Sequence, residues 1–207
     1  ALVENKDPTK IPGVVSRGRN GLINNGIAPI IKDIDNLPFP EKDKLWAIPD
    51  SEKKNVDVSY ICTIRGCPYK CTYCASPFHW DRKTTRLRSP ESVIEEMKNL
   101  KEKYWQGTKF DYSASANISD KESLKIEDNT LVYFVDDVFT VNKKRVKKLL
   151  RMMIDQKLKM KWKCEARADH LDDEICELMA EAGCERVKLG FESGSNKILK
   201  QIEKLET

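Results

Sequence analysis

The alternation of short apolar strands with longer helices from residue 56 onward constrains the fold of this chain most. Strand candidates lie at 56–62, 131–137, 159–169 and 186–193. Helix candidates follow them at 90–104, 143–156, 174–182 and 196–205. Successive β–α units of this kind form parallel strands joined by right-handed crossovers. We therefore predict an α/β fold, a partial (β/α) barrel with about four β–α units.

Two of these strands carry charged residues on one face only. In the third strand, Trp162 and Cys164 alternate with Lys163 and Glu165, and the fourth strand repeats the pattern. A parallel strand that packs on both faces would be apolar throughout. We expect one face of the sheet to pack on helices and the other to line a polar cavity. An edge strand with solvated lysines is the alternative.

The first 55 residues differ in character from the rest. The segment VVSRGRNGLIN predicts a hairpin with Asn20-Gly21 in its turn. The prolines that follow it disfavour both helix and central strand. We predict that residues 1–55 form a hairpin and connector strap at the end of a missing N-terminal domain. Residues 56–207 are predicted to form a core domain that is incomplete at its C-terminal end.

Composition narrows the class of protein. The first residues are polar, and no apolar run approaches the roughly 20 residues that span a bilayer, so we expect a cytoplasmic protein with no membrane contact. A net charge of +4 with 34% charged residues does not call for nucleic acid. In a reducing compartment, seven cysteines indicate metal ligands or buried thiols before disulfides. The polar stretch 106–130 predicts a surface excursion.

Three of the cysteines, Cys67, Cys71 and Cys74, lie in the short stretch GCPYKCTYC. The spacing C-x3-C-x2-C lets one loop hold three corners of an iron–sulfur cubane and leaves one iron without a protein ligand. A zinc site completed by His79 is the alternative, although zinc loops favour paired knuckles and a second knuckle is absent. The remaining cysteines, at positions 62, 164, 176 and 184, are expected to be small buried hydrophobes.

Charged residues follow the predicted strands at the sheet edge where α/β proteins gather their chemistry. The cysteine loop follows the first strand, and the second strand ends in Asp136 and Asp137. Glu165 and Arg167 end the third strand, and Glu192 ends the fourth. The sequence therefore predicts one site that combines thiolates, acids and a guanidinium.

Together these segments resemble the radical S-adenosylmethionine (SAM) enzymes, whose signature is CxxxCxxC with an aromatic or apolar residue before the last cysteine. That residue is Tyr73 in this sequence. The segments TIRGCPYKCTYCASPF, FVDDVFT, CEARADHLDDEICELMAEAGC and LGFESGS are similar to the cobalamin-associated branch of the family. The resemblance implies a partial barrel of the radical SAM type.

The resemblance also implies a cofactor set. Cys67, Cys71 and Cys74 would bind a [4Fe–4S] cluster, and its open iron would take the amino and carboxylate groups of SAM. One electron from the cluster would cleave SAM to methionine and a 5′-deoxyadenosyl radical. Tyr73 would lie against the adenine.

Residues at three strand ends would complete the SAM site. Asp136 and Asp137 stand where the family has a glycine-rich motif that contacts the methionine amino group, and they depart from that motif. Glu192 matches an acid that contacts the ribose. Arg167 or Glu165 would hold the methionine end of SAM or its substrate.

The implied reaction is methyl transfer or a radical rearrangement on an unknown substrate, with a reductant protein such as a flavodoxin or ferredoxin as partner. A methylthiotransferase of the same superfamily is a rival because an arginine-rich segment is shared (Arg82, Arg86, Arg88), although a second set of cluster cysteines is missing. A non-catalytic iron–sulfur or zinc module is the rival from another class.

No Asp-x-His-x-x-Gly loop occurs in the sequence, so cobalamin is expected only through a domain absent from this chain. The unpaired edge of the fourth strand predicts self-association.

Overall fold

A computed structural model describes residues 7–40, 60–76, 85–104 and 131–204 of the chain. The chain divides into two compact units, Ala1–Ile34 and Asp35–Thr207. Several predicted features lie outside the described residues: the domain boundary at 55/56, the surface excursion at 106–130, His79 and Arg82. These features stay predictions.

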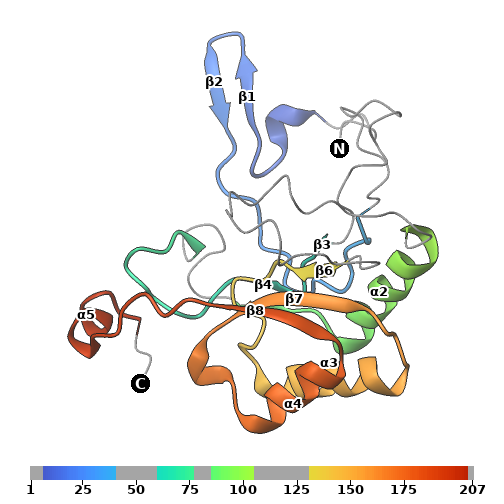
Figure 1. Ribbon diagram of the computed structural model, residues 1–207. Helices are drawn as coiled ribbons and strands as arrows, with labels where there is room; N and C mark the ends of the chain where they lie inside the picture. Colours follow the sequence, from blue (N-terminus) through green and yellow to red (C-terminus); the bar gives the residue numbers. More distant parts are fainter. Residues whose placement is uncertain (1–6, 41–59, 77–84, 105–130, 205–207) are drawn as a thin grey trace, which may run out of the picture. The chain divides into compact units, whose positions relative to one another are not determined.

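The first unit contains the hairpin that the sequence predicts (Figure 1). After a short 3₁₀ helix, η1 (Pro8–Lys10), the strands β1 (Val15–Gly18) and β2 (Gly21–Asn24) pair antiparallel. The turn consists of Arg19 and Asn20 and lies one residue earlier than predicted, because Gly21 already pairs with Gly18. Gly21 has a φ of +123°, in the region that favours glycine.

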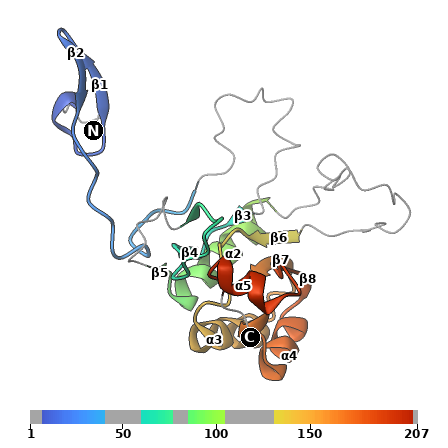
Figure 2. The ribbon, with the colours of Figure 1, turned by 90° about the vertical axis from the view of Figure 1, so that its left-hand side faces the viewer.

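A four-stranded parallel sheet forms the centre of the second unit (Figure 1, Figure 2). Its strands, in the order in which they pair, are β3 (Tyr60–Ile61), β6 (Leu131–Phe134), β7 (Lys161–Ala166) and β8 (Cys184–Leu189). The three pairings are parallel, as the sequence predicts. A small antiparallel pair, β4 (Ile64–Arg65) with β5 (Arg86–Leu87), follows β3 and is not predicted by the sequence pattern.

Helices follow the strands, as predicted. They are α2 (Pro90–Tyr104), α3 (Lys143–Asp155), α4 (Asp173–Glu181) and α5 (Asn196–Gln201), with a short 3₁₀ helix, η4 (Ala168–His170), after β7. The last helix ends before the predicted residue 205, and Glu203 beyond it has a left-handed φ of +53°. No helix in the described part of the chain is long and apolar enough to cross a membrane.

Side-chain caps start these helices where the sequence predicts them. Ser89 Oγ accepts a hydrogen bond from the Ser92 N–H at 3.1 Å in the first turn of α2. The Asn142 side chain caps α3 in the same way, and Asp172 caps α4. Each cap satisfies a backbone N–H that has no partner inside its helix.

Helices α2, α3 and α4 pack on one face of the sheet, and the apolar core lies between them (Figure 1). Phe134, Phe139 and Trp162 form its aromatic centre, with ring centroids 4.9 to 5.4 Å apart. In β7, Trp162 is buried against the helices, whereas Lys163 and Glu165 on the opposite face are half-buried. The predicted separation of an apolar and a charged face is confirmed for this strand.

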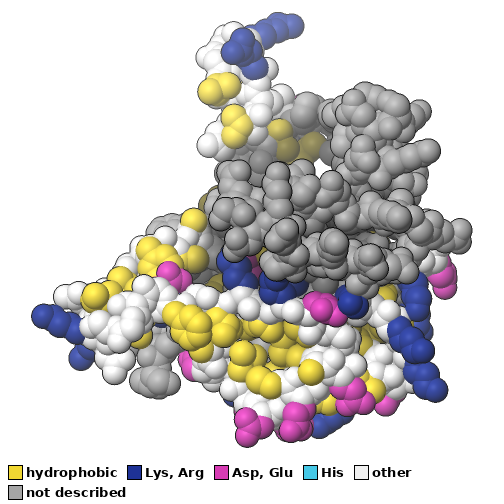
Figure 3. All heavy atoms as spheres, in the orientation of Figure 1, with side chains coloured by type: hydrophobic (Ala, Val, Ile, Leu, Met, Phe, Trp, Pro, Cys, Tyr) yellow, Lys and Arg dark blue, Asp and Glu magenta, His cyan; other side chains and the backbone are white. Residues whose placement is uncertain are grey.

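Acidic side chains gather over α4 on the surface of the molecule (Figure 3). Glu174 of α4 forms ion pairs of 2.5 Å with Lys147 and Arg151 of α3. Exposed pairs of this kind are screened by solvent and contribute little to stability. Lys147 and Arg151 therefore lie on a solvated, salt-bridged face of α3.

Phe134→Ala will lower the free energy of unfolding by about 3–5 kcal/mol, because it removes a fully buried ring and leaves a cavity. Phe191→Ala is the matched control: its ring is 60% exposed, and its loss will change stability by about 0.5 kcal/mol or less. Urea unfolding followed by circular dichroism measures both values. Equal losses in the two variants would contradict a core centred on Phe134.

Candidate metal centre

The three cysteines of the GCPYKCTYC stretch lie on the loop that leaves β4. Gly66 begins this loop with a φ of +102°, a conformation that glycine adopts without strain. Cys67, Cys71 and Cys74 are half-buried, and the Cys74 N–H donates to the Cys71 carbonyl oxygen at 3.1 Å in a tight turn. All seven cysteines of the chain are free thiols. We call residues 66–76 the cysteine loop.

The thiols of the cysteine loop influence one another electrostatically. Burial raises the pKa of Cys67, a hydrogen bond with the Tyr69 backbone opposes this, and negative charge on Asp137, Cys74 and Cys71 raises it further. Across the described ranges, no three His, Cys, Asp or Glu side chains are gathered tightly enough to form a ready metal site. The donor set nevertheless fits an iron–sulfur cluster, because such clusters take thiolates from one short loop as ligands.

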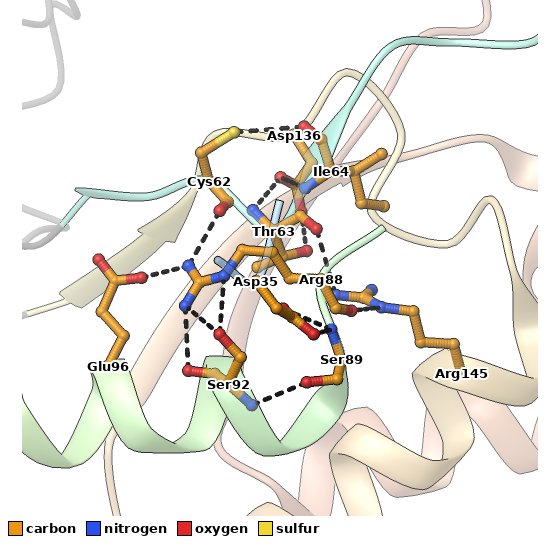
Figure 4. Close-up of polar contacts among 10 residues, drawn as sticks. All are labelled: Asp35, Cys62, Thr63, Ile64, Arg88, Ser89, Ser92, Glu96, Asp136 and Arg145. Carbon is orange, nitrogen blue, oxygen red and sulfur yellow. Dashed lines mark hydrogen bonds and ion pairs between the residues drawn. The ribbon is translucent and has the colours of Figure 1, made fainter. Parts of the chain in front are cut away.

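The Asp136 carboxylate holds the backbone that leads into the cysteine loop (Figure 4). One of its oxygens accepts hydrogen bonds from the N–H groups of Thr63 and Ile64, at 2.6 and 2.8 Å. The other oxygen accepts from the Thr63 hydroxyl at 2.6 Å. Burial raises the pKa of Asp136 to about 6, while these hydrogen bonds and the charge of Arg145 act in the opposite direction. These three hydrogen bonds are donated to the carboxylate oxygens, so they stabilise the ionised form of Asp136.

Two buried arginines extend this anchor to the neighbouring helices (Figure 4). Arg145 of α3 donates to the carbonyl oxygens of Arg88 and Thr63, at 2.6 and 3.3 Å. Arg88, just after β5, donates to the Cys62 carbonyl oxygen at 3.2 Å and pairs with Glu96 of α2. Both strands that flank the cysteine loop are thus tied to the helical layer by charge-assisted hydrogen bonds.

Asp137 contacts the far end of the cysteine loop. Its carboxylate is exposed and accepts a hydrogen bond from the hydroxyl of the buried Ser76. Two adjacent acids at the end of β6 therefore differ in position: Asp136 holds the residues before the loop, and Asp137 holds its last described residue.

The middle of the cysteine loop is held through Tyr69. The Arg167 guanidinium lies over the Tyr69 ring, 3.9 Å from its centroid, and the Tyr69 hydroxyl is hydrogen-bonded to His170 Nε2. Arg167 is only 3% exposed, and Asp169 accepts two of its hydrogen bonds, at 3.0 and 2.8 Å. The end of β7 and the η4 turn therefore face the loop between its first two cysteines.

Tyr73 and Glu192 lie together beside Cys71. Burial raises the pKa of Tyr73, and a hydrogen bond with the Glu192 carboxylate raises it further. Glu192 has a φ of +57°, which is uncommon for a residue other than glycine, and its carboxylate lies 3.5 Å from Lys204 Nζ. The segment after β8 therefore adds an acid and an amine to the surroundings of the loop.

Glu165 lies on the charged face of the sheet and is held there by its neighbours. It accepts hydrogen bonds from the Tyr133 hydroxyl at 2.5 Å and from Lys188 Nζ at 2.9 Å. Lys163 lies over the Tyr133 ring, 4.4 Å from its centroid. Alternating positive, negative and aromatic groups thus run across β6, β7 and β8 on this face.

A family model for the radical SAM superfamily matches residues 61–207. The matched region begins at the end of β3 and contains the cysteine loop and the helices α2 to α5. The chain belongs to the radical SAM superfamily.

Relatives of this radical SAM chain include enzymes with named activities. An uncharacterized methyltransferase of Pyrococcus horikoshii is 29% identical over 204 residues, which cover 99% of this chain and 39% of the relative. The tRNA-2-methylthio-N(6)-dimethylallyladenosine synthase of Aquifex aeolicus is 28% identical over 83% of this chain and 34% of its own length. The chain thus spans well under half the length of these relatives.

A solved structure confirms the fold. The radical S-adenosylmethionine methyltransferase TsrM of Kitasatospora setae, with cobalamin and a [4Fe–4S] cluster bound, matches with a TM-score of 0.64 at 19% identity. The match covers 96% of this chain and 36% of that chain. At this identity the likeness concerns the fold alone, and it confirms the predicted α/β class of radical SAM type.

The predicted site residues of the radical SAM chain occupy three kinds of position. Asp137, Arg167 and Glu192 each contact the cysteine loop directly, whereas Asp136 holds the residues before it. Glu165 lies on the charged sheet face, where its described contacts are to Tyr133 and Lys188. Direct contacts of these residues with a cofactor stay predictions.

Sequence reasoning did not single out Thr63, Tyr69 and Arg145. Two residues near the site could have been noticed from their positions in the sequence. Tyr69 lies inside the cysteine motif, and His170 follows Arg167 closely. His170 is buried and hydrogen-bonded to the hydroxyls of Tyr69 and Thr140. The expectation of a buried thiol is wrong for Cys176, which is exposed on α4.

Asp136→Ala will lower the free energy of unfolding of the cluster-free protein by about 2–5 kcal/mol, since two buried backbone N–H groups lose their acceptor. Asp137→Ala removes the neighbouring, exposed carboxylate and will cost about 1 kcal/mol. Chemical unfolding of both variants provides the comparison. If Asp136→Ala is no worse than Asp137→Ala, the anchoring role of Asp136 is wrong.

Proposed function

We propose that this chain is the core of an enzyme that binds a [4Fe–4S] cluster through Cys67, Cys71 and Cys74 and uses SAM in methyl transfer. The observation that carries the proposal is the cysteine loop, in which three free, half-buried thiols are held next to the end of a parallel sheet. Three thiolate ligands leave one iron of a cubane open for a small ligand. Membership of the radical SAM superfamily supports the same assignment.

The residues around the loop suit the parts of SAM. When bound, the reduced cluster supplies the electron for reductive cleavage of SAM. We assign the Tyr73 ring to the adenine face and the Glu192 carboxylate to the ribose hydroxyls, because both lie beside Cys71. The exposed Asp137 carboxylate is assigned to the methionine ammonium. Asp136 is buried under the loop and positions it.

We place the unknown substrate on the charged face of the sheet. Helices α2 to α4 pack on the opposite face, so this face is free of them. Glu165 and Lys188 offer an acceptor and donors side by side, and Tyr133 adds an aromatic surface. Such a face suits a polar substrate better than an aliphatic one.

Methylthiolation is the second candidate, favoured by the similarity to the Aquifex aeolicus synthase. The arginine-rich segment argues less strongly for it than the sequence suggests. Arg88 is 8% exposed, and its guanidinium is engaged by Glu96, Ser92 and the Cys62 carbonyl oxygen. This side chain braces the fold and is not presented to a nucleic acid.

The proposed cluster chemistry also implies a reductant partner and a reducing cellular compartment. A low-potential reductant protein, such as a flavodoxin or ferredoxin, would supply the electron, and cobalamin is a further candidate cofactor because it is bound in the solved TsrM structure. Seven free cysteines support a reducing compartment such as the cytoplasm. Among the described strands β8 pairs only with β7, which supports self-association through the other edge of β8.

Anaerobic reconstitution with iron and sulfide will give the broad absorption near ~400 nm that thiolate-bound cubane clusters show. Substitution of Cys67, Cys71 or Cys74 by Ala will abolish it, because each supplies one ligand. Cys176→Ala removes an exposed thiol on α4 and will leave the absorption unchanged. Tight stoichiometric zinc without retained iron would contradict the cluster assignment.

Glu192→Ala will weaken SAM binding to the reconstituted protein about 10- to 100-fold, the effect of losing a charge-assisted hydrogen bond. Glu185→Ala is the matched control, because Glu185 and its partner Lys161 lie at the start of β8 and β7, whereas Glu192 follows the end of β8. Isothermal titration under anaerobic conditions measures both affinities. An unchanged affinity in Glu192→Ala would limit Glu192 to its pairing with Lys204.

A further inference from the structure

Tyr69 is the point at which the end of β7 contacts the cysteine loop. It lies between the first two cysteines of the motif, and its side chain is contacted on two sides. His170 Nε2 is hydrogen-bonded to its hydroxyl, and the Arg167 guanidinium covers its ring at 3.9 Å. A tyrosine fixed at both ring face and hydroxyl has little freedom to rotate, so the backbone that carries it is also restrained.

Arg167 is itself held rigidly. Asp169 accepts hydrogen bonds from its Nε and one Nη, and the Lys204 carbonyl oxygen accepts from the other Nη at 3.0 Å. The Tyr69 ring covers one face of the guanidinium. With 3% of its surface exposed, Arg167 is engaged on its edges and on one face by the chain itself.

The His170 ring is oriented by a second hydrogen bond, on the side opposite Tyr69. Its Nδ1 lies 3.2 Å from the Thr140 hydroxyl, and Thr140 is fully buried after β6. A neutral imidazole can donate from one nitrogen and accept at the other, so Thr140 and Tyr69 satisfy both. The order Thr140, His170, Tyr69 forms a hydrogen-bonded line from the core to the cysteine loop.

The segment after α5 holds the loop at a neighbouring point. The Thr72 N–H donates to the Ile202 carbonyl oxygen at 3.0 Å, two residues before the Lys204 carbonyl that binds Arg167. The cysteine loop is therefore restrained next to Cys71 both by the β7 end and by the chain segment after β8.

We infer that Arg167 and His170 are positioning residues for the cysteine loop, acting through Tyr69, and that Arg167 does not hold the methionine end of SAM or the substrate. The inference deepens the proposed function and rests on it for its iron readout only. The inference has a consequence for the protein without a cluster. The contacts of Arg167 and His170 with Tyr69 restrict the exposure of Cys67 and Cys71 before any iron binds.

The test measures alkylation of each thiol by iodoacetamide in the cluster-free full chain, mapped by mass spectrometry. Arg167→Lys and Tyr69→Phe will raise the rates at Cys67 and Cys71 about fivefold, the effect of losing one hydrogen bond or one cation–π contact. The exposed Cys176 reports the general reactivity in the same molecule and will not change. Tyr133→Phe, which loses a tyrosine hydroxyl bonded to Glu165, is the matched control and will leave both rates unchanged.

Conservative rescue separates positioning from a general loss of packing. His170→Ala will raise the two alkylation rates, and His170→Gln, which keeps a hydrogen-bonding group toward Tyr69, will return them to within about twofold of the original values. Circular dichroism identifies any variant that fails to fold, and Arg167→Lys and Tyr69→Phe keep most of each side chain for that reason.

A second readout uses the reconstituted protein. In Arg167→Lys, iron release to a chelator will accelerate about fivefold, while SAM affinity will stay within about twofold. Unchanged alkylation and iron release together with a tenfold or greater loss of SAM affinity would overturn the inference and make Arg167 a SAM ligand. If the original protein retains no iron at all, the proposed function fails, and the alkylation rates still decide the inference.

Discussion

The hydrogen bonds from Thr63 and Ile64 to the Asp136 carboxylate are the interaction on which the rest of the site depends. The Ile61 carbonyl oxygen at the end of β3 still accepts a hydrogen bond from the Val135 N–H. After Ile61 the chain leaves the parallel sheet and turns into β4. Its next N–H groups are buried and need acceptors. One acid at the end of β6 supplies them, so the cysteine loop can begin away from the sheet without unsatisfied backbone groups.

Groups from several parts of the chain then restrain the loop along its length. Asp136 acts before the first cysteine, Arg167 reaches Tyr69 between the first two, and Asp137 reaches Ser76 after the third. A loop ordered in advance loses less conformational entropy when a ligand binds, which favours binding. The arrangement therefore explains how three cysteines on a short loop are kept ready for a cluster.

The sequence predicts the regular elements of this fold well because each has a local cause. Asn142 and Asp172 cap helices whose apolar positions repeat at helical spacing, and Trp162 and Lys163 mark the two faces of β7. The short pairing of β4 with β5 has no such local pattern, because two residues on each side are too few to show alternation. Arg88 lies beside this pair, where its N–H donates to the Thr63 carbonyl oxygen at 2.9 Å and its guanidinium to the Cys62 carbonyl oxygen at 3.2 Å.

The sequence predicts which residues lie near the site, because they follow the ends of strands. It predicts the role of each residue less well. Position in the sequence places Asp136 and Asp137 together, yet only burial separates an anchor from an exposed carboxylate. Arg167 likewise suggests a ligand contact from sequence, whereas in the fold its guanidinium is occupied by Asp169, Tyr69 and the Lys204 carbonyl oxygen. Partners this distant in sequence are visible only in three dimensions.

The central claim is that Cys67, Cys71 and Cys74 hold a [4Fe–4S] cluster with one iron open to SAM. Electron paramagnetic resonance of the reduced, reconstituted protein with and without SAM tests it most directly. We expect a cluster signal whose shape changes when SAM is added, because SAM would enter the coordination sphere of the open iron. A cluster signal that SAM leaves unchanged at saturating concentration would show that the cluster has no iron open to SAM.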